Sequence, residues 1–559
     1  MSGSGVPGFR LPSVTDRPHR AGPEGSRPRR FEEKGAGARP DRGRVRRSAQ
    51  TPAQRGRRGD PARLVAYTVM RAIAEGGYAN IELPKELRRR RMHGRDAAFA
   101  TELTYGATRL RGFYDAVIAI AADRPVARID GGVLDTLRLG AHQLLGMRVP
   151  PHAAADESVA LARAVNGIGA SGLVNAVLRR ISEADLAAWR VRVLDGVDDP
   201  TSRLALEYSH PEWIVKALRQ ALLGHHRSSA ATVDSDLVSL LAADNAAPEV
   251  HLVARPGLSS VEELTAVGGE RHPHVPTAVV QPAGDPGSIA PVRDGRAAVQ
   301  DAGSQVVALV LAAARPHGSA PVSAADPSAP QGAPAGSAPA TDVDHEPRLA
   351  RGDRPERWLD LCAGPGGKAG LLAALALECG ADLVANEIAP HRADLVRQTL
   401  AAAAARFEGA GRTLEVRTGD GREVGRLEPA AYDRVLVDAP CTGLGALRRR
   451  PEARWRRTPA DLANLGVLQR DLLGSAVAAA APGGIVVYAT CSPHLAETTF
   501  VVADVLRRHP EVESVDVRPV VEAVSHGWTG TLGSGPAVQL WPHEHGTDGM
   551  FLALLRRRD

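Results

Sequence analysis

The sequence predicts a multi-domain protein with an all-α domain at the front, a small α/β linking module, and a larger C-terminal α/β domain built on a doubly wound parallel sheet. Two patterns predict this architecture. From residue 61 to 181, apolar residues recur three or four apart, which is typical of amphipathic helices. Over residues 355–559, short apolar runs alternate with helical stretches, which is typical of parallel strands joined by helices. A chain of 559 residues is long enough for several domains.

The first segment, residues 1–60, is a basic tail. It contains fifteen Lys and Arg against six Asp and Glu, a net charge of +9, whereas the whole chain carries +5. Arginines set among Gly and Pro cannot bury apolar surface, so we expect the tail to be disordered. Two interpretations of its role stay open: a solubilising extension, and non-specific binding to a polyanion.

Three further segments follow the tail. Residues 61–181 show the helical period most clearly in the strings LRLGAHQLL and LVNAVLRRI. Residues 182–313 open with a helical stretch and continue with short strand-like runs such as EVHLVAR, which predicts a small α/β module. Residues 314–354 are dominated by Ala, Pro, Ser, Gly and Asp, so we expect a low-complexity insertion without catalytic residues.

The four cysteines, Cys362, Cys379, Cys441 and Cys491, form no CxxC pair and have no His-rich neighbourhood. This spacing indicates neither a disulfide framework nor a metal site, and it fits a reducing cytosol. The first residues lack the apolar core of a signal peptide, and no stretch approaches the length of a membrane span. We therefore expect a soluble, cytoplasmic monomer with no metal and no membrane partner.

The first strand of the C-terminal domain ends in a glycine-rich turn, Asp360-Leu-Cys-Ala-Gly-Pro-Gly-Gly-Lys368. Such glycines let the backbone approach a ligand and leave helix N–H donors pointing at it, although many such turns only join a strand to a helix. The next strand ends at Glu387, where a carboxylate can accept hydrogen bonds from ribose hydroxyls. Asp420 follows the third strand, and it could bond an adenine amino group or form an ordinary Asp–Gly turn.

Two further strands end in cysteine-containing strings, Asp438-Ala-Pro-Cys441 and Ala489-Thr-Cys491-Ser-Pro493. A cysteine in a strand is usually an inert buried hydrophobe. The carboxyl ends of parallel strands meet at one edge of the sheet, however, so we expect both thiols to lie beside the cofactor and near a substrate.

These strings together resemble the NOL/NOP/Sun family of RNA cytosine-C5 methyltransferases. The likeness rests on DLCAGPGGK, VDAPCTGLG, LRRRPEARWR, YATCSP and TDGMFLALL. The helical front end resembles the RNA-binding domain named after NusB, which narrows the likeness to the bacterial ribosomal RNA branch called RsmB, Sun or Fmu. It covers residues 61–559 apart from the insertion. Two residues depart from the family pattern: Gly364 stands where Ala is commoner, and Glu387 stands where Asp is commoner.

The resemblance implies a Rossmann-like class I methyltransferase domain, S-adenosylmethionine as cofactor, and small-subunit (16S) ribosomal RNA as substrate. It implies that Cys491 attacks carbon 6 of the cytosine, that Cys441 assists product release, and that Asp438 bonds the ring near N3. Lys368 is either a site residue or only closes the loop, and the base that removes the carbon-5 proton is not identified. The implied cofactor site consists of Cys362, Ala363, Gly364, Pro365, Gly366, Gly367, Lys368, Glu387, Asp420 and Asp438.

The arginine-rich segment over residues 448–457 combines dense positive charge with one aromatic residue. That composition suits phosphate contact beside the active site, or a solvated charged loop. Two other function classes stay open. One is a non-catalytic RNA-binding or antitermination-type factor, against which the intact cysteines argue. The other is a DNA cytosine methyltransferase, whose nucleophile lies in a Pro-Cys motif that Pro440-Cys441 mimics.

Overall fold

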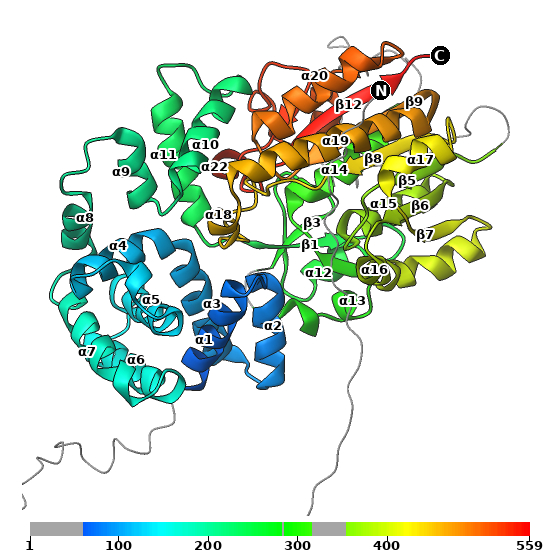
Figure 1. Cartoon of the computed structure of the whole chain (residues 1–559). Helices are drawn as coiled ribbons and strands as arrows, with labels where there is room; N and C mark the ends of the chain where they lie inside the picture. The colour runs from blue at the N-terminus through cyan, green and yellow to red at the C-terminus, as the bar shows by residue number, and fades with distance from the viewer. Residues whose placement is uncertain (1–59, 282–283, 316–353) are drawn as a thin grey trace, which may run out of the picture. The chain divides into compact units, whose positions relative to one another are not determined.

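The computed structural model describes residues 60–281, 284–315 and 354–559 (Figure 1). The basic tail and the low-complexity insertion that the sequence predicts lie almost entirely outside these residues. Within the described ranges, no helix combines the length and the apolar character that crossing a bilayer requires.

The N-terminal part is an all-α domain, as predicted, with α5 at its centre. Residues of α5 from Val133 to Gln143 are all buried, because neighbouring helices pack on every side of it. The first helix begins where the Asp60 carboxylate accepts a hydrogen bond from the Arg63 amide, just before a proline that starts the helix. The helices are α1 (Pro61–Ala74), α2 (Ala79–Arg89), α3 (Gly94–Arg109), α4 (Arg111–Ala122), α5 (Gly131–Leu145), α6 (Pro151–Val165) and α7 (Ile168–Ile181).

The middle of the chain opens with the four helices α8 to α11 and continues with a small antiparallel sheet of strand order β2-β3-β1-β4 and three further helices. Its last helix, α14, packs its apolar residues into the same core as the large C-terminal sheet. The elements are α8 (Leu186–Leu194), α9 (Pro200–Glu207), α10 (Glu212–Gly224), α11 (Val233–Asn245), β1 (Val250–Ala254), α12 (Val261–Thr265), β2 (Glu270–Arg271), β3 (Ala278–Gln281), α13 (Ala290–Arg293), β4 (Ala297–Val299) and α14 (Ala302–Ala313).

The C-terminal domain is built on a mixed sheet of strand order β10-β12-β9-β8-β5-β6-β7. Strands from β9 to β7 are parallel to their neighbours, as the alternation of strands and helices predicts. The strands are β5 (Arg357–Asp360), β6 (Asp382–Glu387), β7 (Leu414–Thr418), β8 (Tyr432–Asp438), β9 (Ala480–Thr490), β10 (Val512–Val515), β11 (Val538–Gln539) and β12 (Phe551–Arg557).

One edge of this sheet differs from the predicted all-parallel arrangement. Strand β12 pairs with β9 in the antiparallel sense, and β10 and β11 both pair antiparallel with β12. The string TDGMFLALL is one apolar run at the end of the chain with no helix after it, so the alternation pattern gave no signal for its direction. The run from Phe551 to Leu555 is buried, which explains its continuous apolar character.

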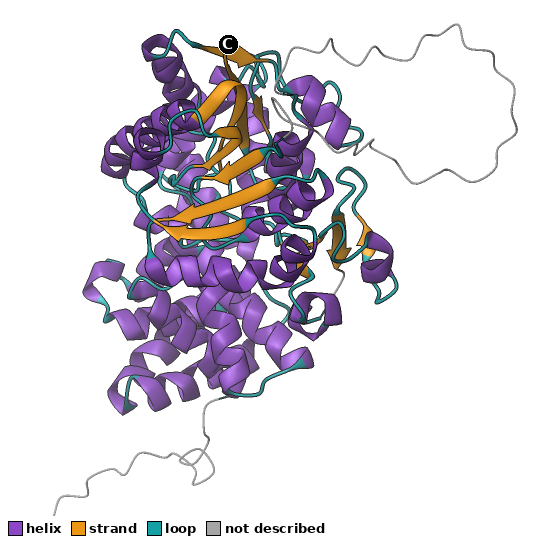
Figure 2. Ribbon diagram, turned by 90° about the vertical axis from the view of Figure 1, so that its right-hand side faces the viewer, coloured by secondary structure: helices purple, strands orange, loops and turns teal. Residues whose placement is uncertain are grey.

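Helices cover both faces of the large sheet, and Figure 2 shows the orange strands between purple helices. One apolar core joins the sheet to α14, α15 and α16, and a second joins its other face to α19 and α20. The helices of this domain are α15 (Gly367–Glu378), α16 (Pro390–Gly409), α17 (Gly421–Leu427), α18 (Ala453–Arg456), α19 (Pro459–Ala479), α20 (Thr499–Arg508), α21 (Arg518–Val524) and α22 (Pro542–His545).

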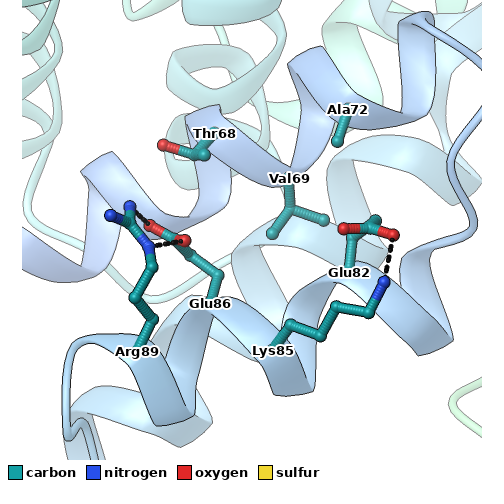
Figure 3. A pocket seen from close by; sticks show the side chains of 7 residues that line it. All are labelled: Thr68, Val69, Ala72, Glu82, Lys85, Glu86 and Arg89. Carbon is teal, nitrogen blue, oxygen red and sulfur yellow. Dashed lines mark hydrogen bonds and ion pairs between the residues drawn. The ribbon is translucent and has the colours of Figure 1, made fainter.

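A pocket of about 230 Å³ lies between α1 and α2 (Figure 3). Its charged lining residues pair with one another: Lys85 with Glu82 at 2.9 Å, and Arg89 with Glu86 at 2.6 Å. These pairs lie on the helix surface and leave no charge aimed at a ligand, so we assign the pocket no function.

Candidate active site

The candidate site lies where the strand order of the large sheet reverses. The chain runs outward from β5 through β6 to β7, and then returns to place β8 on the other side of β5. Ligands of such sheets bind in the crevice beyond the carboxyl ends of the strands on either side of this point. The two residues that close those strands are Asp360 and Asp438.

The glycine-rich turn after β5 is held by Glu387 from the neighbouring strand. The Glu387 carboxylate is 3% exposed and accepts hydrogen bonds from the Gly364 amide at 3.1 Å and the Ala389 amide at 2.9 Å. Arg392 lies 3.3 Å from the same carboxylate. The ribose binding that the sequence predicts for Glu387 would therefore use the lone pairs of the carboxylate that do not accept from these two amides.

The two departures from the family pattern are in contact with each other. A Cβ atom added to Gly364 would lie 2.1 Å from Glu387 Oε2, a distance at which one of them must move. Glutamate reaches one methylene further than aspartate, into the space that an alanine methyl would occupy. The longer acid and the missing methyl therefore compensate for each other.

The turn ends by presenting the N-terminus of α15 to the crevice. Gly366 has φ +113°, a conformation that glycine adopts without strain, and a Cβ there would lie 2.9 Å from Thr399. The next residue, Gly367, begins the helix without a side-chain cap, so its first amides are free to donate to a ligand.

Asp360 is a site residue that the sequence analysis quoted but did not single out. Its side chain is completely buried, and neither carboxylate oxygen is in a well-formed hydrogen bond with the described residues. Burial, reinforced by the nearby charge of Asp438, raises the pKa of Asp360 to about 7. A buried carboxylate without a well-formed hydrogen bond is suited to a cationic ligand, because the cation would compensate for the water that the carboxylate has lost.

Lys368 and Asp438 form an ion pair across the crevice, with Nζ 2.9 Å from Oδ2. Burial opposes the charge on Lys368, but Asp438 outweighs it and the pKa of Lys368 is raised. Lys368 therefore joins the end of β8 to the start of α15, which fixes the carboxylate of Asp438 at the mouth of the crevice.

The two predicted cysteines lie side by side, with Sγ of Cys441 3.4 Å from Sγ of Cys491. Their strands are neighbours, and Asp438 stands opposite Ala489 in the register. The loops that follow the two strands, which carry the two cysteines, therefore come together. The hydrogen bond from Cys441 lowers the pKa of Cys491 against the effect of burial, and Arg450 and Lys368 lower it further. The same bond, together with burial, raises the pKa of Cys441. The pKa values of the two thiols are thus shifted in opposite directions, downward for Cys491 and upward for Cys441.

The family model "16S rRNA methyltransferase RsmB/F" matches residues 349–556, and the NusB family model matches residues 60–183. "Putative methyltransferase MT1451" of Mycobacterium tuberculosis is 49% identical over 513 residues, covering 91% of this chain and 99% of that protein. The chain belongs to the RsmB/F family of 16S rRNA methyltransferases.

More distant proteins are also similar to the chain. "Ribosomal RNA small subunit methyltransferase B" of Klebsiella pneumoniae is 28% identical over 505 residues, covering 89% of this chain and 98% of that protein. The solved structure of PH0851 aligns with a TM-score of 0.66 at 20% identity, covering 89% of this chain and 99% of that one. At that identity the structural match supports the fold of the RsmB/F-family chain and nothing finer.

Two expected site residues of this RsmB/F-family protein have other contacts in the structure. The Asp420 carboxylate accepts from the backbone amide of Arg422 and pairs with its guanidinium at 2.6 Å, so it caps α17. This arrangement matches the Asp–Gly turn that the sequence left open. Burial raises the pKa of Cys362, so its thiol is a neutral lining group rather than a nucleophile.

Four arginines of the arginine-rich segment contact other parts of the chain, which neither interpretation of the segment from sequence anticipated. Arg448 and Arg449 pair with Asp548 and Asp301. Arg454 is fully buried and donates to the carbonyl oxygens of three residues and to one side chain, which are Arg109, Ser209, Asp244 and Asn245. Arg456 donates to the carbonyl oxygens of Ile73 and Gly77. These four guanidiniums fasten the segment to the chain itself.

Proposed function

We propose that this protein transfers a methyl group from S-adenosylmethionine to carbon 5 of a cytosine in 16S ribosomal RNA, with Cys491 as the covalent nucleophile. The observation that carries the proposal is the pair of thiols 3.4 Å apart at the ends of two adjacent strands, with their pKa values shifted in opposite directions. Carbon 5 of cytosine is a poor nucleophile, and addition of a thiolate to carbon 6 makes it reactive.

The crevice residues fit S-adenosylmethionine, which supplies an electrophilic methyl group when bound. Its cationic groups suit Asp360, whose buried carboxylate lacks a well-formed hydrogen bond. Its ribose hydroxyls suit Glu387 at the end of β6, and its carboxylate suits the free amides at the start of α15. Of the other residues of the implied cofactor site, Cys362, Ala363, Gly364, Pro365 and Gly366 form the turn between these groups.

The protein groups at the mouth of the crevice divide the cytosine chemistry among them. Cys491 forms the sulfur–carbon bond at C6, and its lowered pKa supplies the thiolate. Asp438, held by Lys368, is placed to hydrogen-bond the cytosine ring near N3. Cys441 has a raised pKa and lies in contact with Cys491, so it is suited to assist release of the Cys491 sulfur after C5 loses its proton.

Two arginines of the segment over residues 448–457 remain for the RNA backbone. Arg450 is exposed, and its charge acts on Cys491. Arg457 is partly exposed and points its guanidinium at the carbonyl oxygen of Cys441, 3.5 Å away. We assign these two to the phosphates that flank the target nucleotide, because both stand beside the thiol pair.

The test separates the two thiols in the full-length protein incubated with 16S ribosomal RNA and S-adenosylmethionine. Cys491→Ala should abolish both methyl transfer and covalent adduct. Cys441→Ala should allow attack and methylation but impair release, so a protein–RNA species that survives a denaturing gel should accumulate. Bisulfite sequencing of RNA from cells with and without the gene then locates the cytosine.

The opposite pattern contradicts the assignment. If Cys441→Ala abolished the adduct and Cys491→Ala kept it, Cys441 would be the nucleophile, as in DNA cytosine methyltransferases. Adducts with neither RNA nor DNA, together with no methyl transfer, would favour a non-catalytic RNA-binding factor.

A further inference from the structure

Glu497 is a buried carboxylate for which the chemistry above has no role. It closes the short turn Leu495–Glu497, between β9 and α20, and its side chain is fully buried. Its two oxygens accept hydrogen bonds from four donors, which belong to Thr442, Ser492 and Gln469. No sequence motif singled it out, because it stands alone six residues beyond the nucleophile.

The donors come from both cysteine loops. Oε1 accepts from the backbone amide of Thr442 at 2.8 Å and from the side chain of Gln469 at 3.2 Å. Oε2 accepts from the hydroxyl of Ser492 at 2.6 Å and from the hydroxyl of Thr442. Thr442 directly follows Cys441, and Ser492 directly follows Cys491, so one carboxylate holds the residue after each thiol.

We propose that Glu497 is a positioning residue that keeps the two sulfurs in contact by clamping the loops that carry them. This inference rests on the proposed function, in which both thiols act on one cytosine. A carboxylate only accepts hydrogen bonds, so it orients all four donors toward one point. A glutamine of the same shape has one oxygen and an NH2 group, so the hydroxyls of Thr442 and Ser492 would have to accept instead of donate, and the charge that strengthens the four hydrogen bonds would be lost.

The charge of Glu497 also acts on the thiols. Together with Asp438 it raises the pKa of Cys441, whereas Arg450 and Lys368 act on Cys491 in the opposite direction. Removing the charge should therefore make Cys441 more acidic and reduce the difference between the two thiols. That change can be measured in the protein alone, without RNA.

The test compares full-length wild type with Glu497→Gln. We expect kcat on 16S ribosomal RNA to fall by about 10- to 100-fold, as for loss of one or two hydrogen bonds to a charged group, with KM changed by less than about twofold. In parallel, limiting iodoacetamide should label Cys491 before Cys441 in wild type, and should label both at similar rates in the variant.

The matched control is Glu356→Gln, which removes a different buried carboxylate of the same domain. Glu356 accepts from Trp358 and Arg434, away from the cysteine loops. This variant should lose thermal stability while keeping the wild-type kcat of its folded fraction and the wild-type order of thiol labelling.

Two results overturn the proposal. In the first, Glu497→Gln loses stability but keeps the wild-type kcat and labelling order, which makes Glu497 merely structural. If Glu497→Gln does not fold, Ser492→Ala and Thr442→Val replace it, because each removes one hydroxyl that donates to Glu497. Each should lower kcat about tenfold. Wild-type kcat and wild-type labelling in both variants is the second result that overturns the proposal. Absence of cytosine methylation by wild type would defeat the proposed function instead, and thiol labelling would still report on the clamp.

Discussion

The contact between Gly364 and Glu387 makes a quantitative prediction about the cofactor site. In Gly364→Ala, the new methyl group would lie 2.1 Å from Glu387 Oε2, so the carboxylate must retreat by about 1 Å to reach a tolerable separation. It would then lose the 3.1 Å hydrogen bond from the backbone amide of residue 364. A hydrogen bond to a charged group contributes about 1.5–3 kcal/mol, so affinity for S-adenosylmethionine should fall roughly 10- to 100-fold.

The compensating change is Glu387→Asp. Alone, the shorter acid should also weaken binding, because it no longer reaches the amide of Gly364. Combined with Gly364→Ala, it leaves room for the methyl group and restores the pairing that is commoner in the family. We expect the double variant to bind more tightly than the sum of the single losses predicts, with a coupling energy of about 1 kcal/mol or more.

Calorimetric titration of S-adenosylmethionine into the four proteins measures this coupling, and thermal unfolding of the same proteins gives a readout that does not depend on the cofactor. Additive losses, within about 0.5 kcal/mol, would show that the two residues do not constrain each other. An unchanged affinity in Gly364→Ala would remove the turn from the cofactor site altogether.

Three further predictions test other parts of the molecule. The pKa of Asp360 is raised to about 7, so affinity for the cationic cofactor should fall as pH drops below that value. Asp360→Asn should bind weakly at every pH. Wild type should lose folding stability as pH rises from about 4 to about 7, because the unfolded carboxyl ionises before the folded one, and the variant should lack this loss. Wild-type pH dependence in the variant would contradict the assignment. Deleting residues 1–59, which keeps Asp60 as the cap of α1, should leave kcat intact and flatten the salt dependence of RNA binding. Calorimetry or filter binding at several salt concentrations measures that dependence. Equal slopes for the full-length and truncated proteins would show that the tail does not bind RNA. Arg454→Ala should destabilise the protein by on the order of 3 kcal/mol in urea unfolding, because it leaves four buried acceptors unpaired, whereas Arg450→Ala should change stability little.

The sequence by itself determined the architecture and the residues at the strand ends. Strand and helix periods are local properties, and turn chemistry marks where each element ends, so Glu387, Asp438, Cys441 and Cys491 could be placed near the crevice without coordinates. Adjacent parallel strands bring their carboxyl ends together, and that rule predicted that both thiols lie at the edge of the sheet where the cofactor is expected.

Only the tertiary structure decided what surrounds these residues. The direction of β12 depends on which neighbour it pairs with, and an apolar run carries no such information. The arginines of the segment over residues 448–457 look alike in sequence, yet Arg454 is buried and Arg450 is exposed. Arg454 is buried because its partners come from segments far away in the chain.

The roles of the thiols also depend on long-range contacts. Cys441 and Cys491 differ because one donates to the other, and because Glu497 and Arg450 place opposite charges on the two sides of the pair. Hydrogen bonding and burial in a folded core set these differences, and both arise only when segments far apart in the chain pack together.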